Sequence, residues 1–266
     1  MAGYADDLAL AHLLADTADA VSTARFRALD LHVEAKPDLT PVSDADTAVE
    51  KAIRSTLARA RPRDGVLGEE FGRSAAPAGP GSRYWVIDPI DGTKNFVRGV
   101  PIWATLIALM EGDTPVVGLV SAPALGRRWW AARGLGAFAG KHQHAATRIG
   151  VSSVRALADA SFCYASLNGW AENGRLDAML DILLGVWRSR AYGDFYGYML
   201  LAEGALDAMA EPELSLWDMA ALIPIITEAG GKVTDLDGRA TADKSSVIAT
   251  NGLLHETVLT ALARRG

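Results

Sequence analysis

The chain has 266 residues, about 50% of them hydrophobic, which is enough to build one large packed core or two smaller ones. Its net charge of −6 argues against nucleic acid as the main partner, and its single cysteine, Cys163, excludes an intramolecular disulfide and a cysteine-based zinc site. No apolar run approaches the ~18 residues of a membrane span, and Asp6 and Asp7 stand where a secretory signal needs basic and apolar residues, so we expect a soluble, cytoplasmic protein without a membrane partner.

The N-terminal part of the chain is predicted to be mainly helical. Residues 5–28 are rich in Ala and Leu at helical spacing. A turn-rich loop follows at 36–41, after which either Ser43 or Asp44 can cap a second helix that ends before Pro62. A short strand is then predicted at 66–70, followed by a loop rich in Ala, Pro and Gly at 73–82.

The segment 84–91 carries the most informative residues of the chain. Its first four residues are aromatic or β-branched, as in a buried strand. Pro89 disfavours a helical conformation for Asp88, so Asp88 is expected to stay extended at the strand end. Asp91 follows three residues later, which places two carboxylates at the point where the strand stops.

The residues after Asp91 are suited to hold an anion. Gly92 permits a tight turn, and Thr93 begins a short predicted helix whose N–H groups and dipole favour negative charge. Carboxylates beside a phosphate would repel it unless cations lie between them, and such oxygen ligands favour Mg²⁺ or Mn²⁺. The alternative is an ordinary turn, since Asp-Pro and Asp-Gly are common turn formers.

Strands dominate the middle of the chain, and helices alternate with strands after it. The predicted strands cover 104–110, 116–121, 128–133, 136–139, 160–166, 232–236 and 246–250. The predicted helices cover 176–187, 195–206 and 217–229, the last of which contains Pro224 and should lose a hydrogen bond there. The polar stretch 140–153 is the best candidate for a boundary, so we expect an N-terminal half at 1–145 and a C-terminal half at 146–266.

Two further acidic residues are candidates for the same site. Glu69 lies at a predicted strand end before a glycine turn, and Asp218 lies in an otherwise apolar helix start. Taken singly, Glu69 is better explained as a solvated turn residue and Asp218 as a helix cap. Together with Asp88 and Asp91, however, they form a far more specific pattern.

This pattern resembles the inositol monophosphatase-like family of Mg²⁺-dependent phosphatases. The resemblance runs from about Lys36 to Asn251 and includes 227–231 after the Trp-Asp motif. Within the family the chain is most similar to the actinobacterial histidinol-phosphate phosphatases. The segments that carry this closer match are 36–41, 95–101, 190–195 and 250–255.

The resemblance implies a metal site with two or three Mg²⁺ ions. Glu69, Asp88 and the Ile90 carbonyl would hold one ion, and Asp88, Asp91 and Asp218 would hold the second. Glu69 would also help to bind a looser third ion. Two ions of this kind activate water and neutralise the leaving oxygen.

The resemblance also implies roles for residues around the metals. The N–H groups of Gly92 and Thr93 would bind phosphate, and the Thr93 hydroxyl, paired with Asp44, would orient or activate the attacking water. Lys36 would steady the cluster from a loop. Lys94 departs from the family, where a second Thr is common, and we expect it to face solvent.

Substrate choice requires residues outside the metal cluster. Family position points to Asp194 and Glu211 as partners for the cationic groups of histidinol, with Arg190 and Asn251 as further candidates. The alternative for Asp194 is a helix cap. A metal role for His142 and His144 is not expected, because no carboxylate stands near them in sequence.

The expected fold is α/β (α+β), with the layered α/β/α/β/α architecture of the sugar phosphatases, and the expected assembly is a homodimer. The leading functional hypothesis is hydrolysis of L-histidinol phosphate in histidine biosynthesis. The alternatives are a broader inositol-phosphate or sugar-phosphate phosphatase on the same site and, in a different class, a regulatory binding protein.

Overall fold

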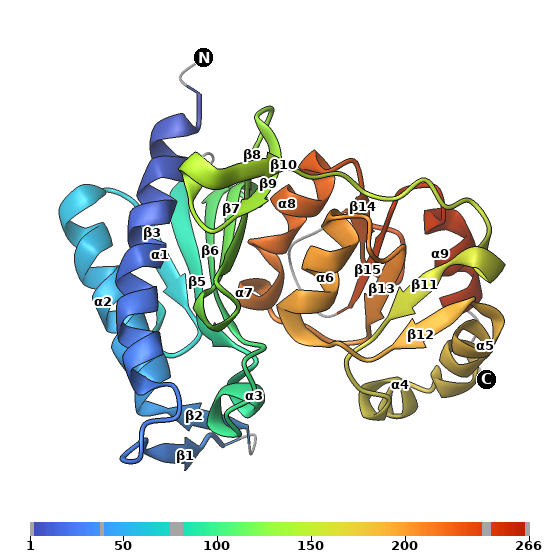
Figure 1. Cartoon of the computed structure of the whole chain (residues 1–266), viewed down its shortest axis with the longest axis horizontal. Helices are drawn as coiled ribbons and strands as arrows, with labels where there is room; N and C mark the ends of the chain where they lie inside the picture. Colours follow the sequence, from blue (N-terminus) through green and yellow to red (C-terminus); the bar gives the residue numbers. More distant parts are fainter. Residues whose placement is uncertain (1–2, 38–39, 75–81, 241–245, 264–266) are drawn as a thin grey trace.

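Two large β-sheets and three layers of helices organise the chain, as Figure 1 shows. The computed structural model describes residues 3–37, 40–74, 82–240 and 246–263. Helices cover the outer face of each sheet, and a further helical layer lies between the two sheets. The predicted α/β/α/β/α layering is therefore confirmed. The described helices include no candidate for a bilayer span.

The first sheet has eight strands in the order β10-β9-β8-β7-β6-β5-β3-β4. All neighbours are antiparallel except β3 and β5, which are parallel. Its strands are β3 (Gly65–Gly68), β4 (Gly72–Arg73), β5 (Arg83–Asp91), β6 (Ala104–Glu111), β7 (Thr114–Ala122), β8 (Arg127–Ala132), β9 (Gly136–Gly140) and β10 (Ala146–Arg148). Because β10 pairs with β9, this sheet extends past residue 145; the division at 145/146 stays a prediction.

Strand β5 is buried on both faces, because its side chains alternate between two cores. Trp85 and Ile87 pack against the outer helices α1 (Ala5–Arg25) and α2 (Asp44–Ala60), whereas Tyr84 and Val86 face the helices between the sheets. Asp88 continues the second set, so the strand alternation turns it toward the interior of the molecule. The predicted first and second helices are confirmed, and α1 ends three residues earlier than expected.

The second sheet has five strands in the order β12-β11-β13-β15-β14. Its strands are β11 (Ser161–Cys163), β12 (Arg188–Arg190), β13 (Ala208–Glu211), β14 (Lys232–Thr234) and β15 (Val247–Thr250). Its outer face is covered by α4 (Asn168–Glu172), α5 (Leu176–Gly185) and α9 (His255–Leu262). Cys163 is fully buried in this sheet, as expected for a core residue.

The layer between the sheets contains α6 (Asp194–Ala202) and α8 (Leu222–Glu228), with α7 (Leu216–Met219) beside β5. The single helix predicted at 217–229 is therefore wrong, since it is divided into α7 and α8. Pro224 is the third residue of α8, in the first turn, where backbone N–H groups have no intrahelical hydrogen-bond partner. It therefore fits at the start of a new helix and does not kink a long one.

Short elements complete the chain. The described residues of the loop predicted at 36–41 lie at a hairpin of β1 (Val33–Ala35) and β2 (Pro41–Ser43), which the sequence did not predict. The 3-10 helices are η1 (Pro123–Leu125), η2 (Gln143–Ala145) and η3 (Leu157–Asp159), and α3 (Thr93–Val97) follows β5. Helix α5 ends at Gly185, so Trp187 is exposed and does not continue the predicted stripe. Most of the loop predicted at 73–82 lies outside the described residues.

Candidate metal centre

Three of the predicted acidic residues converge at the end of β5. One carboxylate oxygen from each of Asp88, Asp91 and Asp218 lies within 4.8 Å of the others. Asp88 and Asp91 flank an irregularity in the pairing of β5 with β6. This departure from regular alternation allows both carboxylates to reach the same place, which Asp218 enters from α7.

Asp218 combines the role expected of a helix cap with a place in the cluster. Its Oδ2 accepts a 2.7 Å hydrogen bond from the N–H of Ser215, the residue before α7, and so closes a capping box. The cap fixes the side chain beside Asp88 and Asp91. The two explanations weighed for Asp218 are thus compatible.

Asp88 is the most deeply enclosed of the three carboxylates. Its side chain is 2% exposed, and Oδ1 has no hydrogen-bond partner among the described residues. An ionised carboxylate oxygen that is buried without a partner is costly. A cation that fills its coordination would remove this cost.

Glu69 lies on the same cavity, at the end of β3. Its N–H donates to the Ile87 carbonyl at 3.2 Å, which continues the ladder with β5. The Lys36 ammonium bridges its carboxylate and that of Glu70, at 2.6 and 2.8 Å. Burial lowers the pKa of Lys36, but the hydrogen bonds to both glutamates outweigh it, so the pKa is raised overall.

The carboxyl groups of the cluster have raised pKa values. Burial raises the pKa of Asp88 well above its ordinary range, and the charge of Glu69 raises it further. Burial also raises the pKa of Asp91, with Asp194 as the next cause, and raises the pKa of Asp218 to about 7. Divalent cations would reverse this repulsion, and carboxylate oxygens are the donors that Mg²⁺ prefers. The residues therefore fit a divalent metal.

A cavity of about 660 Å³ opens over the cluster. It is lined on one side by the metal candidates and the segment after β5, and on the other by residues of the second half. The lining consists of Thr40, Pro41, Glu69, Asp88, Ile90, Asp91, Gly92, Thr93, Lys94, Asn95, Ala165, Ser166, Ala191, Tyr192, Gly193, Asp194, Glu213, Leu214, Ser215, Trp217 and Asp218. The cavity is thus large enough for a small phosphorylated molecule.

Gly92 makes the turn between the metal candidates and α3. Its φ is +82°, a value that favours glycine, and an added Cβ would lie 3.1 Å from the Ile102 carbonyl oxygen. The N–H groups of Asn95 and Phe96 bond to its carbonyl and close the first turn of α3. Phe96 also packs with Trp103 in a small core that supports this turn.

The predicted pairing of Thr93 with Asp44 is wrong. The Thr93 hydroxyl lies 3.2 Å from Asp46 Oδ1 and 3.0 Å from the Ile90 carbonyl. Asp46 is the third residue of α2, and its Oδ2 accepts the N–H and hydroxyl of Ser43 at 2.8 and 2.5 Å. This capping box is visible in the sequence as Ser-Asp-Ala-Asp and indicates that Asp46 turns back toward Ser43, but it does not indicate which carboxylate faces Thr93.

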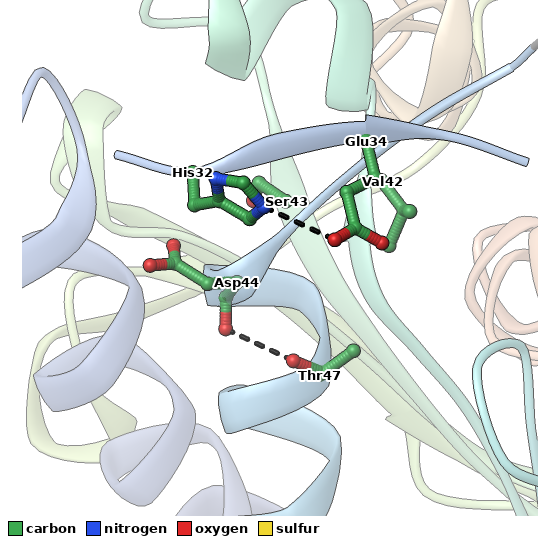
Figure 2. A pocket seen from close by; sticks show the side chains of 6 residues that line it. All are labelled: His32, Glu34, Val42, Ser43, Asp44 and Thr47. Carbon is green, nitrogen blue, oxygen red and sulfur yellow. Dashed lines mark hydrogen bonds and ion pairs between the residues drawn. The ribbon is translucent and has the colours of Figure 1, made fainter. Parts of the chain in front are cut away.

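Asp44 faces a different and smaller pocket, of about 150 Å³, shown in Figure 2. Its carboxylate pairs with Arg25 at 2.7 Å, and its carbonyl accepts the Thr47 hydroxyl. His32 Nε2 and Glu34 Oε1 lie within hydrogen-bond distance, 3.0 Å apart, on the other side of this pocket. Asp44 is thus part of the packing between α1, α2 and the β1–β2 hairpin.

Of the residues predicted to select the substrate, the acidic residue Asp194 lines the cavity. Its φ is +49°, uncommon for a residue with a side chain, and Oδ2 accepts a 3.1 Å hydrogen bond from Asn95. Burial raises its pKa, while Lys94 opposes the shift. The preceding Gly193 caps α6, and Asp194 is the first residue of that helix. The next N–H, of Phe195, donates to Asp91 at 2.6 Å.

The other candidates for substrate contact lie outside this cavity. Glu211 is 8% exposed at the end of β13 and accepts a 3.0 Å hydrogen bond from the Tyr198 hydroxyl. Arg190 is exposed and donates to the Ser189 carbonyl. Asn251 is buried and uses its amide in hydrogen bonds to Ser152 and to the Val154 carbonyl. The cavity receives Glu213 instead, which the sequence did not single out.

Two minor expectations concern side chains at the surface. Lys94 is exposed, although it also lines the mouth of the cavity. His142 and His144 are exposed with ring centroids 6.2 Å apart, and among the described residues no third ligand joins them.

Sequence and structure comparisons cover the chain almost completely. Residues 6–266 match the inositol monophosphatase family. The chain is 62% identical over 269 residues to a histidinol-phosphatase of Streptomyces coelicolor, covering 100% of both proteins, and 58% identical over 257 residues to a histidinol-phosphatase of Mycobacterium tuberculosis, covering 97% and 98%. A solved structure of an IMPase/NADP phosphatase complexed with Mg²⁺ and phosphate has a TM-score of 0.83 at 25% identity, covering 98% of this chain and 95% of that one.

Proposed function

The chain belongs to the inositol monophosphatase family of metal-dependent phosphatases, and we propose that it hydrolyses L-histidinol phosphate to L-histidinol and phosphate with Mg²⁺. The observation that carries the metal-dependent chemistry is the convergence of Asp88, Asp91 and Asp218 within 4.8 Å in a cavity of substrate size. The substrate assignment is supported by the two histidinol-phosphatases that are 62% and 58% identical over nearly all of the chain.

The metal ligands are proposed on the basis of the donor set. Glu69, Asp88 and the Ile90 carbonyl would hold one Mg²⁺, and Asp88, Asp91 and Asp218 a second. The unpartnered Oδ1 of Asp88 supports this role, as does the Mg²⁺ and phosphate complex of the solved relative. When bound, such ions neutralise phosphoryl oxygens and lower the pKa of water. The same proposal includes a third ion, held near Glu69. It also includes Mn²⁺ as a metal that can replace Mg²⁺.

Thr93 and Asp46 are proposed to orient the attacking water. The single proton of the Thr93 hydroxyl is directed at Asp46 Oδ1 and the Ile90 carbonyl, which leaves the hydroxyl oxygen free to accept a hydrogen bond from water. Burial raises the pKa of Asp46, while hydrogen bonds from Ser43 lower it. Asp46 therefore replaces Asp44 as the partner in this role.

The phosphate group is proposed to bind at the turn after β5. Gly92 and Thr93 line the cavity beside the metal candidates, and their N–H groups would hold phosphate oxygens. Lys36 is proposed to steady Glu69, with which it already pairs at 2.6 Å. Its positive charge offsets part of the repulsion that Glu69 exerts on Asp88.

The leaving group is proposed to be recognised on the opposite wall of the cavity. Histidinol carries an ammonium group and an imidazole, for which Asp194 offers a carboxylate. Glu213 adds a second carboxylate on the same wall, and Tyr192 and Trp217 add aromatic side chains to the lining. This wall would favour histidinol phosphate over a neutral polyol phosphate.

A substrate comparison tests the proposal. We expect kcat/KM for L-histidinol phosphate to exceed that for inositol 1-phosphate and fructose 1,6-bisphosphate, and we expect a chelator to abolish all three activities until Mg²⁺ is restored. A preference for inositol phosphate would overturn the substrate assignment and leave the phosphatase intact. A regulatory binding role would be favoured if Asp88→Asn abolished turnover without changing the cellular phenotype.

Location in the cytoplasm, which is expected from the composition and the N-terminal residues, and assembly as a homodimer, which the family resemblance implies, stay predictions. Sedimentation of the full chain at several concentrations checks the second of these. A monomer at all concentrations would contradict it.

A further inference from the structure

We propose that Glu50 is a positioning residue that holds the metal ligand Glu69 in place. Glu50 lies in the middle of α2, and its side chain is fully buried. No part of the proposed mechanism uses it. A buried carboxylate needs strong partners, and those of Glu50 lie mainly in the turn that carries Glu69. This inference rests on the proposed metal site.

The partners of Glu50 are backbone N–H groups of the β3–β4 turn. Its Oε2 accepts the N–H of Glu70 at 2.8 Å, and its Oε1 accepts the N–H of Phe71 at 3.3 Å. The Glu69 N–H is bonded to the Ile87 carbonyl of β5. Three consecutive N–H groups of the turn are therefore held. That of Glu69 is bonded to β5, and those of Glu70 and Phe71 are bonded to Glu50 of α2.

The approach of Glu50 to this turn is very close. A Cβ atom added to Gly68 would lie 2.0 Å from Glu50 Oε1, so a side chain at Gly68 would displace the Glu50 carboxylate. Arg54, one helical turn after Glu50, donates to Oε1 at 2.7 Å and also donates to the Gly72 carbonyl. Glu50 and Arg54 together enclose the turn from Gly68 to Gly72.

This arrangement has a consequence for metal binding. The Glu69 side chain would be flexible if only its own strand end held it, and its carboxylate would then lose entropy on binding an ion. Because the backbone is fixed on both sides of Glu69, part of this entropy loss no longer occurs when the ion binds. Outer groups that orient metal ligands typically change metal affinity by roughly 10–100-fold.

The chain offers a matched control in Glu228. Its two carboxylate oxygens accept the N–H groups of Gly134 and Gly136, each at 2.8 Å, in the β8–β9 turn. Glu50 and Glu228 thus make the same kind of contact from a helix to a turn of the same sheet. Only the turn held by Glu50 carries a proposed metal ligand.

The test compares the full-length wild type, Glu50→Gln and Glu228→Gln, with Mn²⁺ as the probe. Binding is followed by the electron paramagnetic resonance signal of free Mn²⁺, and folding by thermal unfolding without metal. We expect Glu50→Gln to weaken Mn²⁺ binding by roughly 10-fold or more and to raise the Mg²⁺ concentration needed for activity, with KM for the phosphate ester at saturating Mg²⁺ unchanged. We expect Glu228→Gln to lower the unfolding temperature without changing Mn²⁺ affinity.

Equal Mn²⁺ affinity in the wild type and Glu50→Gln would overturn the inference while leaving the metal site in place. Absence of Mn²⁺ binding by the wild type would overturn the proposed function and this inference together. If Glu50→Gln does not fold, Arg54→Lys serves instead, because lysine keeps the charge and loses the fork that reaches both Glu50 and Gly72. Weaker Mn²⁺ binding in that variant supports the inference, and unchanged binding rejects it.

Discussion

Asp46 links the start of α2 to Thr93 through its two carboxylate oxygens. Oδ2 closes the capping box with Ser43, and Oδ1 lies 3.2 Å from the Thr93 hydroxyl. The cap therefore sets the position of Oδ1, the oxygen that accepts the Thr93 hydroxyl. A local stabilising motif and a proposed catalytic contact share one side chain, and this relation leads to the first prediction.

Asp46→Asn and Asp44→Asn form a matched pair at the start of the same helix. Asp46→Asn should lower kcat by roughly 10²–10⁴-fold, because the Thr93 hydroxyl loses its charged partner. Asp44→Asn should keep nearly full kcat and cost at most ~1 kcal/mol of stability, since it weakens only a partly exposed pair with Arg25. Steady-state kinetics and thermal unfolding measure both effects. A larger loss of kcat in Asp44→Asn would reinstate Asp44.

Asp218→Asn should separate metal binding from folding. The amide remains able to accept the N–H of Ser215, so the start of α7 should persist. Removal of a carboxylate from a repulsive cluster should stabilise the metal-free protein by on the order of 2 kcal/mol near neutral to alkaline pH. The same change should cut kcat severely and reduce the rise in unfolding temperature that Mg²⁺ produces. An unchanged response to Mg²⁺ would remove Asp218 from the ligand set.

Stabilisation by Mg²⁺ should depend on pH. Burial raises the pKa of Asp218 to about 7, so in the metal-free protein its contribution to stability is greatest below the unfolded pKa near 4 and is lost as pH rises toward 7. Mg²⁺ requires the ionised carboxylates, so its affinity should increase over the same range. The increase in unfolding temperature on adding Mg²⁺ should be small at about pH 5 and large at about pH 8. A response that is constant or inverted with pH would contradict this assignment.

Asp194→Asn should alter substrate choice more than catalysis. Loss of a charge-assisted hydrogen bond to histidinol should raise KM for L-histidinol phosphate by roughly 10–100-fold. The KM for inositol 1-phosphate, which has no cationic group, should change little. Kinetics with both substrates under saturating Mg²⁺ measure the ratio. Equal effects on the two KM values would show that Asp194 acts on the site as a whole, as its contact with Asn95 would allow.

Glu211→Gln should change stability and leave substrate binding alone. Burial raises the pKa of Glu211 to about 8, so its folded form holds a proton that the unfolded chain releases above about pH 4.5. Stability should therefore fall by up to ~1.4 kcal/mol per pH unit between these values in the wild type, and the slope should be smaller in the variant. Denaturant titrations across this range test the slope. A raised KM for L-histidinol phosphate in Glu211→Gln would return Glu211 to the substrate site.

Local sequence patterns determined much of this protein. The strand before Asp88, the turn at Gly92 and the helix that Ser43 caps were all predicted from neighbouring residues, because strand alternation, backbone freedom and capping act over a few positions. The family pattern then predicted that Asp88, Asp91 and Asp218 would converge, which the structure shows.

Tertiary structure decided which of two similar carboxylates contacts Thr93. Asp44 and Asp46 are two residues apart at a helix start, where each residue turns the side chain by about 100°, so they face different neighbours. Glu211 is held inside by Tyr198, while Glu213, beyond the strand, lines the cavity. The hydrogen bonds from the turn after Glu69 to Glu50 likewise join segments that are distant in sequence. Such contacts depend on how helices and strands pack across the fold, which no short stretch of sequence encodes.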